Sequence, residues 1–404
     1  MIENNLIINN YIQKFHLNSH VAKNLNSQYK KKINQIKDKI KIPNQFFNLF
    51  NKDYNFSVDI SDLKKFNGYK SVALIGMGGS ILGAEAIYNF FKKNVKKDFY
   101  FLDDLDVSKI IEFKKKIRIN KTLFIVISKS GNTIETLSNL FYLDILKKNS
   151  KNIIIITEKK DNILYNISKK FNLFFVEHKN YIGGRYSVLS EVGMVPAELM
   201  GLNEKKFKQL NYLIKNKAFI NFLIQNVSSI HSNIIKGKKN CVILNYDEKL
   251  NNFLKWYQQL SAESLGKKGN GFFPIISTMP KDNHSLLQLY LDGPKNNFFS
   301  FFFSRDRNQF KFNNAFIIDG LEHLKKKSLD QVMYAQKKAT QNVFNKKKLS
   351  FRSFEIKNKS EETLGELFTF FILETLMLSS LLNVNPINQP SVELIKIETK
   401  KILK

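Results

Sequence analysis

Residues 122–136, TLFIVISKSGNTIET, join a strand, a hydroxyl-rich turn and a helix without a break. The apolar run 123–127 is long enough for a buried strand and too short for a helix. A helix is expected to begin at Ile134, directly after the turn. Unpaired backbone N–H groups and the positive end of the helix dipole favour an anion at such a turn, so we expect a phosphate-binding loop.

The alternative for this stretch is a plain loop whose Ser and Thr residues only cap the helix. Capping needs one hydroxyl, whereas Ser128, Ser130 and Thr133 supply three. Gly131 lies between them and permits close approach of a ligand. The stretch therefore favours an anion site over capping alone.

The same order of strand, turn and helix recurs along the whole chain. Short apolar strands are expected at 71–75, 98–102, 123–127, 152–157 and 173–177 in the first half, and at 241–246, 272–276, 298–303 and 315–319 in the second. Strands that alternate with helices predict βαβ units and parallel sheets, with ligands at the carboxyl ends of the strands. We therefore expect an α/β protein with two domains.

Helical segments are expected to flank these domains. We place an N-terminal helical segment at 1–45, the first α/β domain at 46–205, the second at 206–382 and a C-terminal helical arm at 383–404. The N-terminal segment should hold one or two surface helices that end near Pro43. A chain of 404 residues is too long for one ordinary core, which supports the division.

The formal net charge of +29 invites a nucleic-acid partner, because basic residues neutralise phosphate backbones. All but five of the 64 basic residues are lysine, however, whereas base readout depends on the planar guanidinium of arginine. The lysine excess accompanies many Asn, Ile and Phe residues, which share AT-rich codons. We attribute the charge to genome composition and expect no specific nucleic-acid partner.

Three features bear on where the protein works. The single cysteine, Cys241, is expected to be a small core residue and suits a reducing cytoplasm. The N-terminus has an early Glu3 and no basic segment followed by an apolar one, so no signal peptide is expected. The most apolar helical stretch, 367–382, contains Glu374 and is too short to span a bilayer. We expect a soluble cytoplasmic protein with no membrane partner.

Other segments carry residues suited to chemistry. The turn 76–80, GMGGS, lacks the full G-x-G-x-x-G spacing, so a nicotinamide cofactor is disfavoured. Arg185 follows two glycines and could make a surface ion pair or stabilise a developing oxyanion. Gln259 and Glu263 lie four residues apart on one helix face, a pair that alone is typical of an exposed polar face.

Histidine and lysine positions add little by themselves. The six histidines are scattered without the paired spacing of a zinc site, so no metal is expected. His284 precedes an apolar stretch and could equally be a helix-capping or a buried histidine. Lys396 is one lysine among many and carries no signal alone.

Taken in order, six segments resemble the motifs of the glucose-6-phosphate isomerase family. They are GMGGSILG, SKSGNTIET, GGRYS, AESLGK, NHSLLQLYLDGP and QPSVELIK. The resemblance runs from about Val72 to Lys396, and the GGRYS and ES-x-GK segments are its specific parts. The chain is similar to a compact bacterial form of the family.

The resemblance implies two sugar-isomerase (SIS) type domains, each a three-layer αβα arrangement with a parallel sheet. It also implies a homodimer with shared active sites and a sugar phosphate substrate. The binding residues that it implies are Gly79, Ser80, Ser128, Lys129, Ser130, Thr133, Gln259 and Gln389. Among these, Lys129 contributes its backbone and Ser80 lies beside the sugar.

The catalytic residues that the resemblance implies are Glu263, Arg185, His284 and Lys396. Glu263 moves a proton between carbon 2 and carbon 1 of glucose 6-phosphate or fructose 6-phosphate, through a cis-enediol(ate), in glycolysis or gluconeogenesis. Arg185 offsets the enediolate charge. His284, helped by Lys396, opens the sugar ring and reaches in from the neighbouring subunit. No cofactor or metal is implied.

Three departures and two alternatives accompany the resemblance. The phosphate loop reads SKSGNT where many members have SKTFTT, KDNH replaces NGQH before the histidine, and Pro390 stands where many members have Trp. An isomerase that also accepts mannose 6-phosphate is one alternative, although Gln259 leans towards glucose. A noncatalytic sugar-phosphate sensor is the other, but it would lose the acid/base set that Glu263, His284 and Lys396 preserve.

Overall fold

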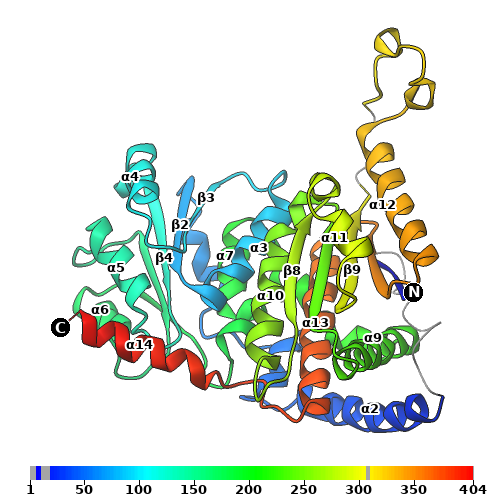
Figure 1. The fold of residues 1–404 in the computed structure, drawn as a ribbon. Helices are drawn as coiled ribbons and strands as arrows, with labels where there is room; N and C mark the ends of the chain where they lie inside the picture. The colour runs from blue at the N-terminus through cyan, green and yellow to red at the C-terminus, as the bar shows by residue number, and fades with distance from the viewer. Residues whose placement is uncertain (1–5, 11–18, 306–309, 404) are drawn as a thin grey trace.

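The computed structural model describes residues 6–10, 19–305 and 310–403, which form two five-stranded sheets flanked by helices (Figure 1). The first sheet has the strand order β3-β2-β4-β5-β6 and every pair in it is parallel. Its strands are β2 (Ser71–Gly76), β3 (Asp98–Leu102), β4 (Thr122–Ile127), β5 (Ile153–Thr157) and β6 (Phe174–Glu177). All five strands predicted in the first half of the chain are confirmed to within a residue.

Helices cover both faces of the first sheet. Apolar side chains of α3 (Leu82–Phe91) and α7 (Glu191–Leu199) pack on one face. Those of α4 (Val107–Lys116), α5 (Ile134–Leu143) and α6 (Ile163–Lys170) pack on the other. Strands β4 and β5 are buried along their whole length, as continuous apolar runs in a doubly covered parallel sheet should be.

The second sheet has the order β1-β10-β9-β7-β8. Its parallel strands are β7 (Asn240–Asn245), β8 (Phe273–Thr278), β9 (Asn297–Ser304) and β10 (Phe351–Ile356). Helices α9 (Lys217–Ile235), α10 (Asn251–Leu265) and α13 (Glu361–Leu381) cover one face. Helices α11 (Leu287–Asp292) and α12 (Leu329–Lys346) cover the other.

Both sheets therefore lie in three-layer α/β arrangements, as predicted. The remaining helices are α2 (Ser19–Ile40), the short α8 (Leu210–Leu213) and α14 (Pro390–Ile402). Helix α2 ends close to the predicted Pro43, and α13 and α14 bracket the break expected in the C-terminal part. Cys241 lies fully buried in β7, as expected of a core residue.

One strand predicted for the second sheet is wrong, and one of its strands was not predicted. Residues 315–319 form no strand: a short 3-10 helix, Asn314–Phe316, and turns occupy this stretch, and Ile318 is exposed. That position in the sheet is occupied instead by β10. The charged Arg352 interrupts the apolar run of β10, so the sequence pattern does not indicate a buried strand there. The Arg352 guanidinium and the Glu374 carboxylate of α13 form a buried ion pair, which lets a charged residue occupy a core strand.

The N-terminal part also departs from expectation. Helices were expected throughout 1–45, but β1 (Leu6–Asn10) adds an antiparallel strand to the edge of the otherwise parallel second sheet. Residues 1–5 and 11–18 lie outside the described part of the chain. The second sheet is therefore mixed, with its first strand supplied from the start of the chain.

Helix α13 is long and apolar enough to pass a simple test for a membrane-spanning helix, and it is longer than the stretch 367–382 read from the sequence. Of its most apolar window, 83% is buried inside the protein. Phe368 and Phe371 of α13 pack around Phe253 of α10. Helix α13 is thus a core helix of the second domain.

One apolar cluster joins the two domains. It contains Ile87 of α3 and Val195 of α7 from the first domain together with Leu254 of α10 and Leu367 of α13 from the second. Helices α3 and α10 pack directly against each other, as Figure 1 shows near the centre of the molecule. The junction between the domains is therefore a continuous core.

Glu85 of α3 lies at this junction, close to Lys255 of α10. Burial, and then the charge of Asp103, raise the pKa of the Glu85 carboxyl to about 7 from 4.5. Because the folded-state pKa is the higher one, the stability present below the unfolded pKa is lost as the pH rises through the folded pKa. We expect Glu85→Gln to raise the free energy of unfolding at about pH 8 and to change it little at about pH 4.

Urea unfolding at both pH values measures this difference. Glu112→Gln on α4 is the matched control, because the Glu112 side chain is 70% exposed in a surface pair with Lys116. A Glu85→Gln variant no more stable than wild type at the higher pH would contradict the assignment.

Candidate active site

The turn after β4 gathers the three predicted hydroxyls. The Ser128 Oγ lies 2.8 Å from Thr133 Oγ1 and 3.5 Å from Ser130 Oγ. Thr133 stands at the N-cap of α5, yet its side chain accepts no capping hydrogen bond from that helix. The Thr133 hydroxyl thus does not serve as a cap, which favours the anion site over the capping alternative.

The packing of this turn against α6 requires a glycine at position 131. Its φ is +68°, and a Cβ added there would lie 1.7 Å from the Asn162 Oδ1. That same oxygen accepts a hydrogen bond from the Tyr165 N–H and so caps α6. The glycine therefore lets the loop pack tightly against the start of α6.

Lys129 points its side chain away from the hydroxyls. Its Nζ donates to the Asn180 carbonyl at 2.9 Å and lies 3.6 Å from the Glu158 carboxylate. Burial lowers the pKa of the neighbouring His178 to about 4, and the nearby Lys129 charge acts in the same direction. The Lys129 carbonyl accepts from the Glu158 N–H and the Thr157 hydroxyl, and the contribution of its backbone to binding stays a prediction.

The GMGGS turn after β2 contacts residues of both domains. A Cβ on Gly79 would lie 2.3 Å from the Gly184 carbonyl carbon, and one on Gly78 would lie 2.7 Å from the Gln259 Nε2. The short 3-10 helix Gly78–Ser80 also contains Ser80, the residue expected beside the sugar. Strands β2 and β4 are neighbours, so this turn lies beside the hydroxyl-rich loop.

The Glu263 carboxylate is held on both of its oxygens. Gln259, one turn earlier on α10, donates from Nε2 to Oε1 at 3.0 Å. Arg185, from the 3-10 helix Gly184–Leu189 of the first domain, donates from Nη1 to Oε2 at 3.1 Å. The Glu263 side chain is 33% exposed, so a ligand can still reach it.

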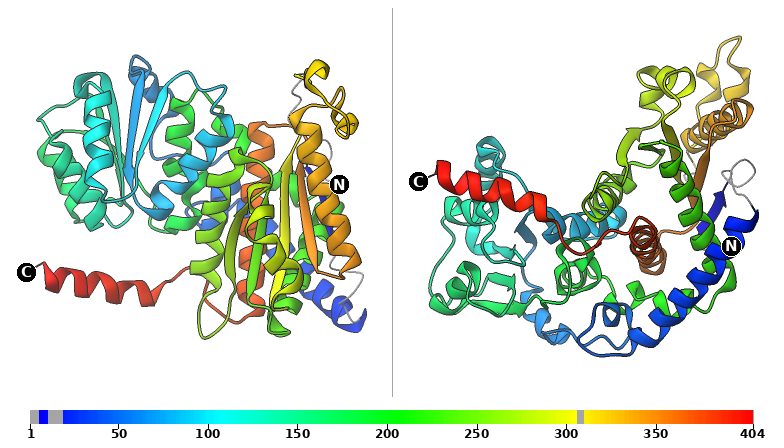
Figure 2. Two further views of the ribbon diagram at one scale, coloured as in Figure 1. Left: turned by 45° about the horizontal axis from the view of Figure 1, so that its top comes forward. Right: turned by 60° about the horizontal axis from the view of Figure 1, so that its bottom comes forward.

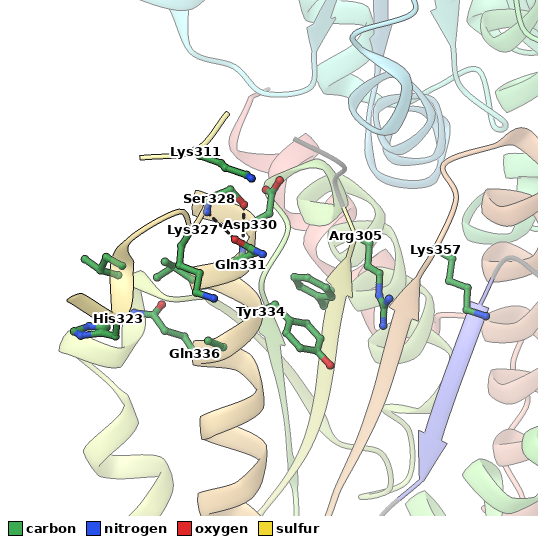
Figure 3. Close-up of a pocket in the computed structure, with 14 residues that line it drawn as sticks. Arg305, Lys311, His323, Lys327, Ser328, Asp330, Gln331, Tyr334, Gln336 and Lys357 are labelled. Carbon is green, nitrogen blue, oxygen red and sulfur yellow. Dashed lines mark hydrogen bonds between the residues drawn. The ribbon is translucent and has the colours of Figure 1, made fainter. Parts of the chain in front are cut away.

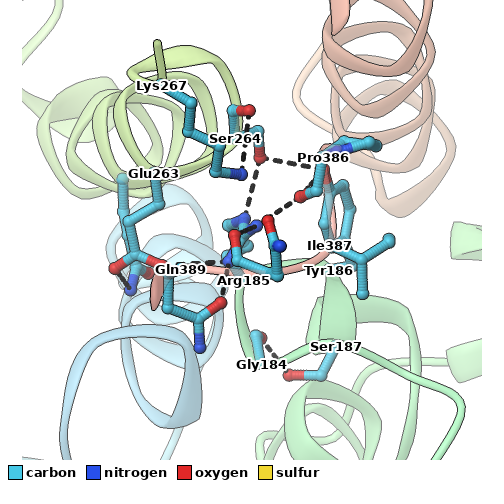
Figure 4. A network of polar contacts seen from close by, with 12 residues as sticks. Gly184, Arg185, Tyr186, Ser187, Glu263, Ser264, Lys267, Pro386, Ile387 and Gln389 are labelled. Carbon is cyan, nitrogen blue, oxygen red and sulfur yellow. Dashed lines mark hydrogen bonds and ion pairs between the residues drawn. The ribbon is translucent and has the colours of Figure 1, made fainter. Parts of the chain in front are cut away.

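Arg185 is the centre of this cluster (Figure 4). Its side chain is 2% exposed, and Nε donates to Ser264 at 2.8 Å while Nη1 donates to Gln389 at 2.9 Å. Its five N–H groups have acceptors on the side chains of Glu263, Ser264 and Gln389 and on the carbonyls of Pro386 and Asn388. Residues predicted from three distant segments thus meet at one guanidinium.

Two predicted catalytic residues lie outside the cluster. His284 ends the 3-10 helix Lys281–His284 after β8 and is exposed, and no described hydrogen bond or ion pair joins it to Glu263. Asp282, in the unusual KDNH segment, accepts from Ser277 and holds this turn. Lys396 lies on α14, where its Nζ pairs with Glu393 at 2.6 Å.

Sequence reasoning missed three residues that support the cluster. The Ser264 hydroxyl bridges Arg185 and the Tyr186 hydroxyl, the latter at 2.8 Å, and burial raises the pKa of Tyr186. Burial, and then the Arg185 charge, lower the pKa of Lys267 to about 8. All three lie inside the GGRYS and AESLGK segments, so the motifs themselves are the sequence signal that could have identified them.

A cavity of about 1290 Å³ opens elsewhere, beside the start of α12 (Figure 3). Arg305, Lys327 and Tyr334 are among the residues that line it, and none of the predicted site residues does. Arg305 is already engaged by the Glu355 carboxylate. Across residues 6–10, 19–305 and 310–403, no group of three His, Cys, Asp or Glu side chains is placed to hold a metal ion.

The contact between Gly79 and Gly184 yields a prediction. Gly79→Ala places a methyl group against main-chain atoms of residues 184 and 185, and no side-chain rotation can relieve that clash. Overpacking of this kind costs about 1–3 kcal/mol. We expect a lower melting temperature and weaker binding of sugar phosphates. Gly68→Ala is the control, because nothing lies within 4 Å of its added Cβ. Equal melting temperatures for the two variants would show that the close contact at Gly184 does not require a glycine at position 79.

Comparison with known proteins agrees with this geometry. The family profile described as phosphoglucose isomerase matches residues 52–272, more than half of the chain. The glucose-6-phosphate isomerase of Methanocaldococcus jannaschii is 30% identical over 387 residues, which cover 90% of this chain and 93% of that protein.

Solved structures share the fold. A hypothetical protein from Thermus thermophilus superposes with a TM-score of 0.85 at 23% identity and covers 98% of this chain and 99% of that one. A glucose-6-phosphate isomerase from Chlamydia trachomatis superposes with a TM-score of 0.78 at 18% identity, covering 98% and 88%. The expected fold class, two sugar-isomerase-type α/β domains, is thereby confirmed. This chain belongs to the phosphoglucose isomerase family.

Proposed function

We propose that this chain interconverts glucose 6-phosphate and fructose 6-phosphate as an aldose–ketose isomerase of glycolysis or gluconeogenesis. The observation that carries the proposal is the Glu263 carboxylate, held between Gln259 and Arg185 at the junction of the domains. The relative from M. jannaschii bears the name of this activity and aligns over almost the whole chain.

Glu263 takes the proton from carbon 2 and returns it to carbon 1. All five N–H donors of Arg185 already have acceptors. An enediolate oxygen can therefore accept a hydrogen bond from Nη1 only if the bond to Glu263 or to Gln389 breaks. Glu263 becomes neutral when it takes the proton, which weakens its hold on Nη1 as the enediolate charge forms. The guanidinium can then turn its charge from the base to the intermediate.

Gln259 has a second function in this proposal. Its Nε2 orients Glu263, while its Oε1 is buried and lacks a hydrogen-bond partner among the described residues. A buried acceptor left unpaired is costly, and a sugar hydroxyl can supply the missing donor. Gln259 thereby links the pose of the sugar to the orientation of the base.

The hydroxyl-rich loop binds the phosphate in this proposal and does no chemistry. Ser128, Ser130 and Thr133 face one another at the start of α5, where an anion is favoured. Binding energy from the remote phosphate then holds the reacting carbons in register with Glu263. Ser80 and Gly79 lie between the two regions.

His284 and Lys396 open the sugar ring, with His284 supplied by a second subunit of a cytoplasmic homodimer. The exposed position of His284, apart from Glu263, supports this arrangement. On the neighbouring edge strand β8, Phe273 is 71% exposed, an apolar surface that a subunit contact would cover. A two-fold axis would let one such contact complete both sites.

The alternatives gain no support from the comparisons. A noncatalytic sugar-phosphate sensor does not need the base that Gln259 and Arg185 hold in place. Acceptance of mannose 6-phosphate by the same site is a narrower question, and measuring both sugars in one assay answers it.

The direct test is conversion of fructose 6-phosphate to glucose 6-phosphate by the purified protein without added metal. We expect Glu263→Gln to abolish turnover while leaving folding and phosphate binding intact, because the variant keeps the shape of the side chain and removes the base. Solvent deuterium exchange at carbon 2, followed by NMR, measures the step itself. Exchange at a near wild-type rate in the variant would rule out Glu263 as the base.

Complementation tests the shared site. Inactive Glu263→Gln and His284→Ala proteins are mixed and allowed to exchange subunits, which native mass spectrometry verifies. Heterodimers should regain one intact site of two, so activity should appear where neither parent has any. Verified exchange without activity would place both residues in the site of one subunit.

A further inference from the structure

Helix α14 carries Lys396 but has little to hold it in place. None of its described side chains is buried, and Figure 2 shows it extending from the end of α13 as a separate arm. Leu394 and Ile395 are 65% and 69% exposed. The position of α14 therefore depends on the linker 383–389 that precedes it.

The linker is held through its main-chain carbonyls. The Lys267 Nζ donates to the Asn385 carbonyl at 2.5 Å and to the Ser264 carbonyl in the last turn of α10 at 3.1 Å. The Tyr186 hydroxyl lies 3.1 Å from the Pro386 carbonyl, to which it donates. Together with the Arg185 contacts described above, these bonds fasten the linker to both domains (Figure 4).

Among the linker residues only Val384 is buried, so packing fixes the start of the linker and not its later part. A cavity of about 900 Å³ lies beside the linker, and Asn385 and Asn388 line it along with Lys267 and the loop 268–271. The linker thus has free space on one side, and the polar contacts decide where it lies. Loss of a contact would release the linker into that space.

We propose that Lys267 is a positioning residue that, with Tyr186, holds the linker to α14 and so sets the position of that helix. This rests on the proposed function for the role of Lys396, but the anchoring itself does not. Lys267 spans the end of α10 and the linker, so it couples the helix of Glu263 to the helix of Lys396. Its donors are engaged by carbonyl oxygens, which sets it apart from a substrate-binding lysine.

The test compares Lys267→Met with Lys268→Met. Lys268 is the adjacent exposed lysine, so its variant removes the same charge without touching the linker. We expect faster amide hydrogen exchange across 385–402 in Lys267→Met only, measured by mass spectrometry, a readout that requires no enzymatic activity. Lys267→Arg, which keeps a charged donor, should restore protection.

Kinetics then separate positioning from binding. We expect Lys267→Met to lower kcat by up to about 100-fold with little change in KM, as misplacement of a reacting group does. Combined with Lys396→Met, the losses should not add, because both variants remove one function. If Lys267→Met fails to fold, Tyr186→Phe removes one linker contact and carries the same comparison.

Two results would overturn the proposal. Unchanged exchange across 385–402 in Lys267→Met would show that the linker is held by other means. A raised KM with unchanged exchange would make Lys267 a substrate-binding residue instead. If the wild-type protein lacks isomerase activity, the proposed function fails, but the exchange measurement still decides whether Lys267 anchors the linker.

Discussion

A buried guanidinium can persist only where each of its donors finds an acceptor, and Arg185 meets that condition with acceptors from two segments that lie far from it in the sequence. One is α10 of the second domain, and the other is the linker to α14. Removing one partner from a buried charged pair typically costs about 3–5 kcal/mol, because the other charge is left uncompensated. The relative placement of Glu263 and Gln389 is thus a condition for burying Arg185 as much as a feature of the active site.

The rigidity that this cluster needs comes from the core around it. Helices α3 and α7 of the first domain and α10 and α13 of the second share one apolar cluster, so the domains do not meet across a wet cleft at this level. Gly79 lets its turn approach the backbone at Gly184 within the first domain, and Gly78 leaves room for the Gln259 side chain of the second domain. The proposed base on α10 and the proposed phosphate loop after β4 can then keep a fixed separation, which a reaction at one end of a sugar phosphate requires.

The sequence predicted the first sheet well because its strands are buried on both faces and read as unbroken apolar runs. It failed at β10, where Arg352 and Glu355 interrupt the run and find their charged partners only in the folded chain. It wrongly predicted a strand at 315–319, where the apolar residues Phe316 and Ile318 lie on the surface. The motifs identified most of the candidate site. They did not indicate that every Arg185 donor would bond within the protein, nor that Lys267 would hydrogen-bond to the linker. Those facts depend on contacts between distant segments, which spacing along the chain does not encode.

The pairing of β1 with β10 bears on the order in which the molecule can be completed. The strands of the first sheet follow one another from Ser71 to Glu177 and can assemble as soon as that stretch leaves the ribosome. Strand β1 is made before any of them, yet its partner is the last strand of the chain to be synthesised. During translation β1 therefore cannot pair with β10 until nearly the whole polypeptide has emerged from the ribosome. An affinity tag fused at the N-terminus would lie close to this edge strand and could compete with its pairing to β10.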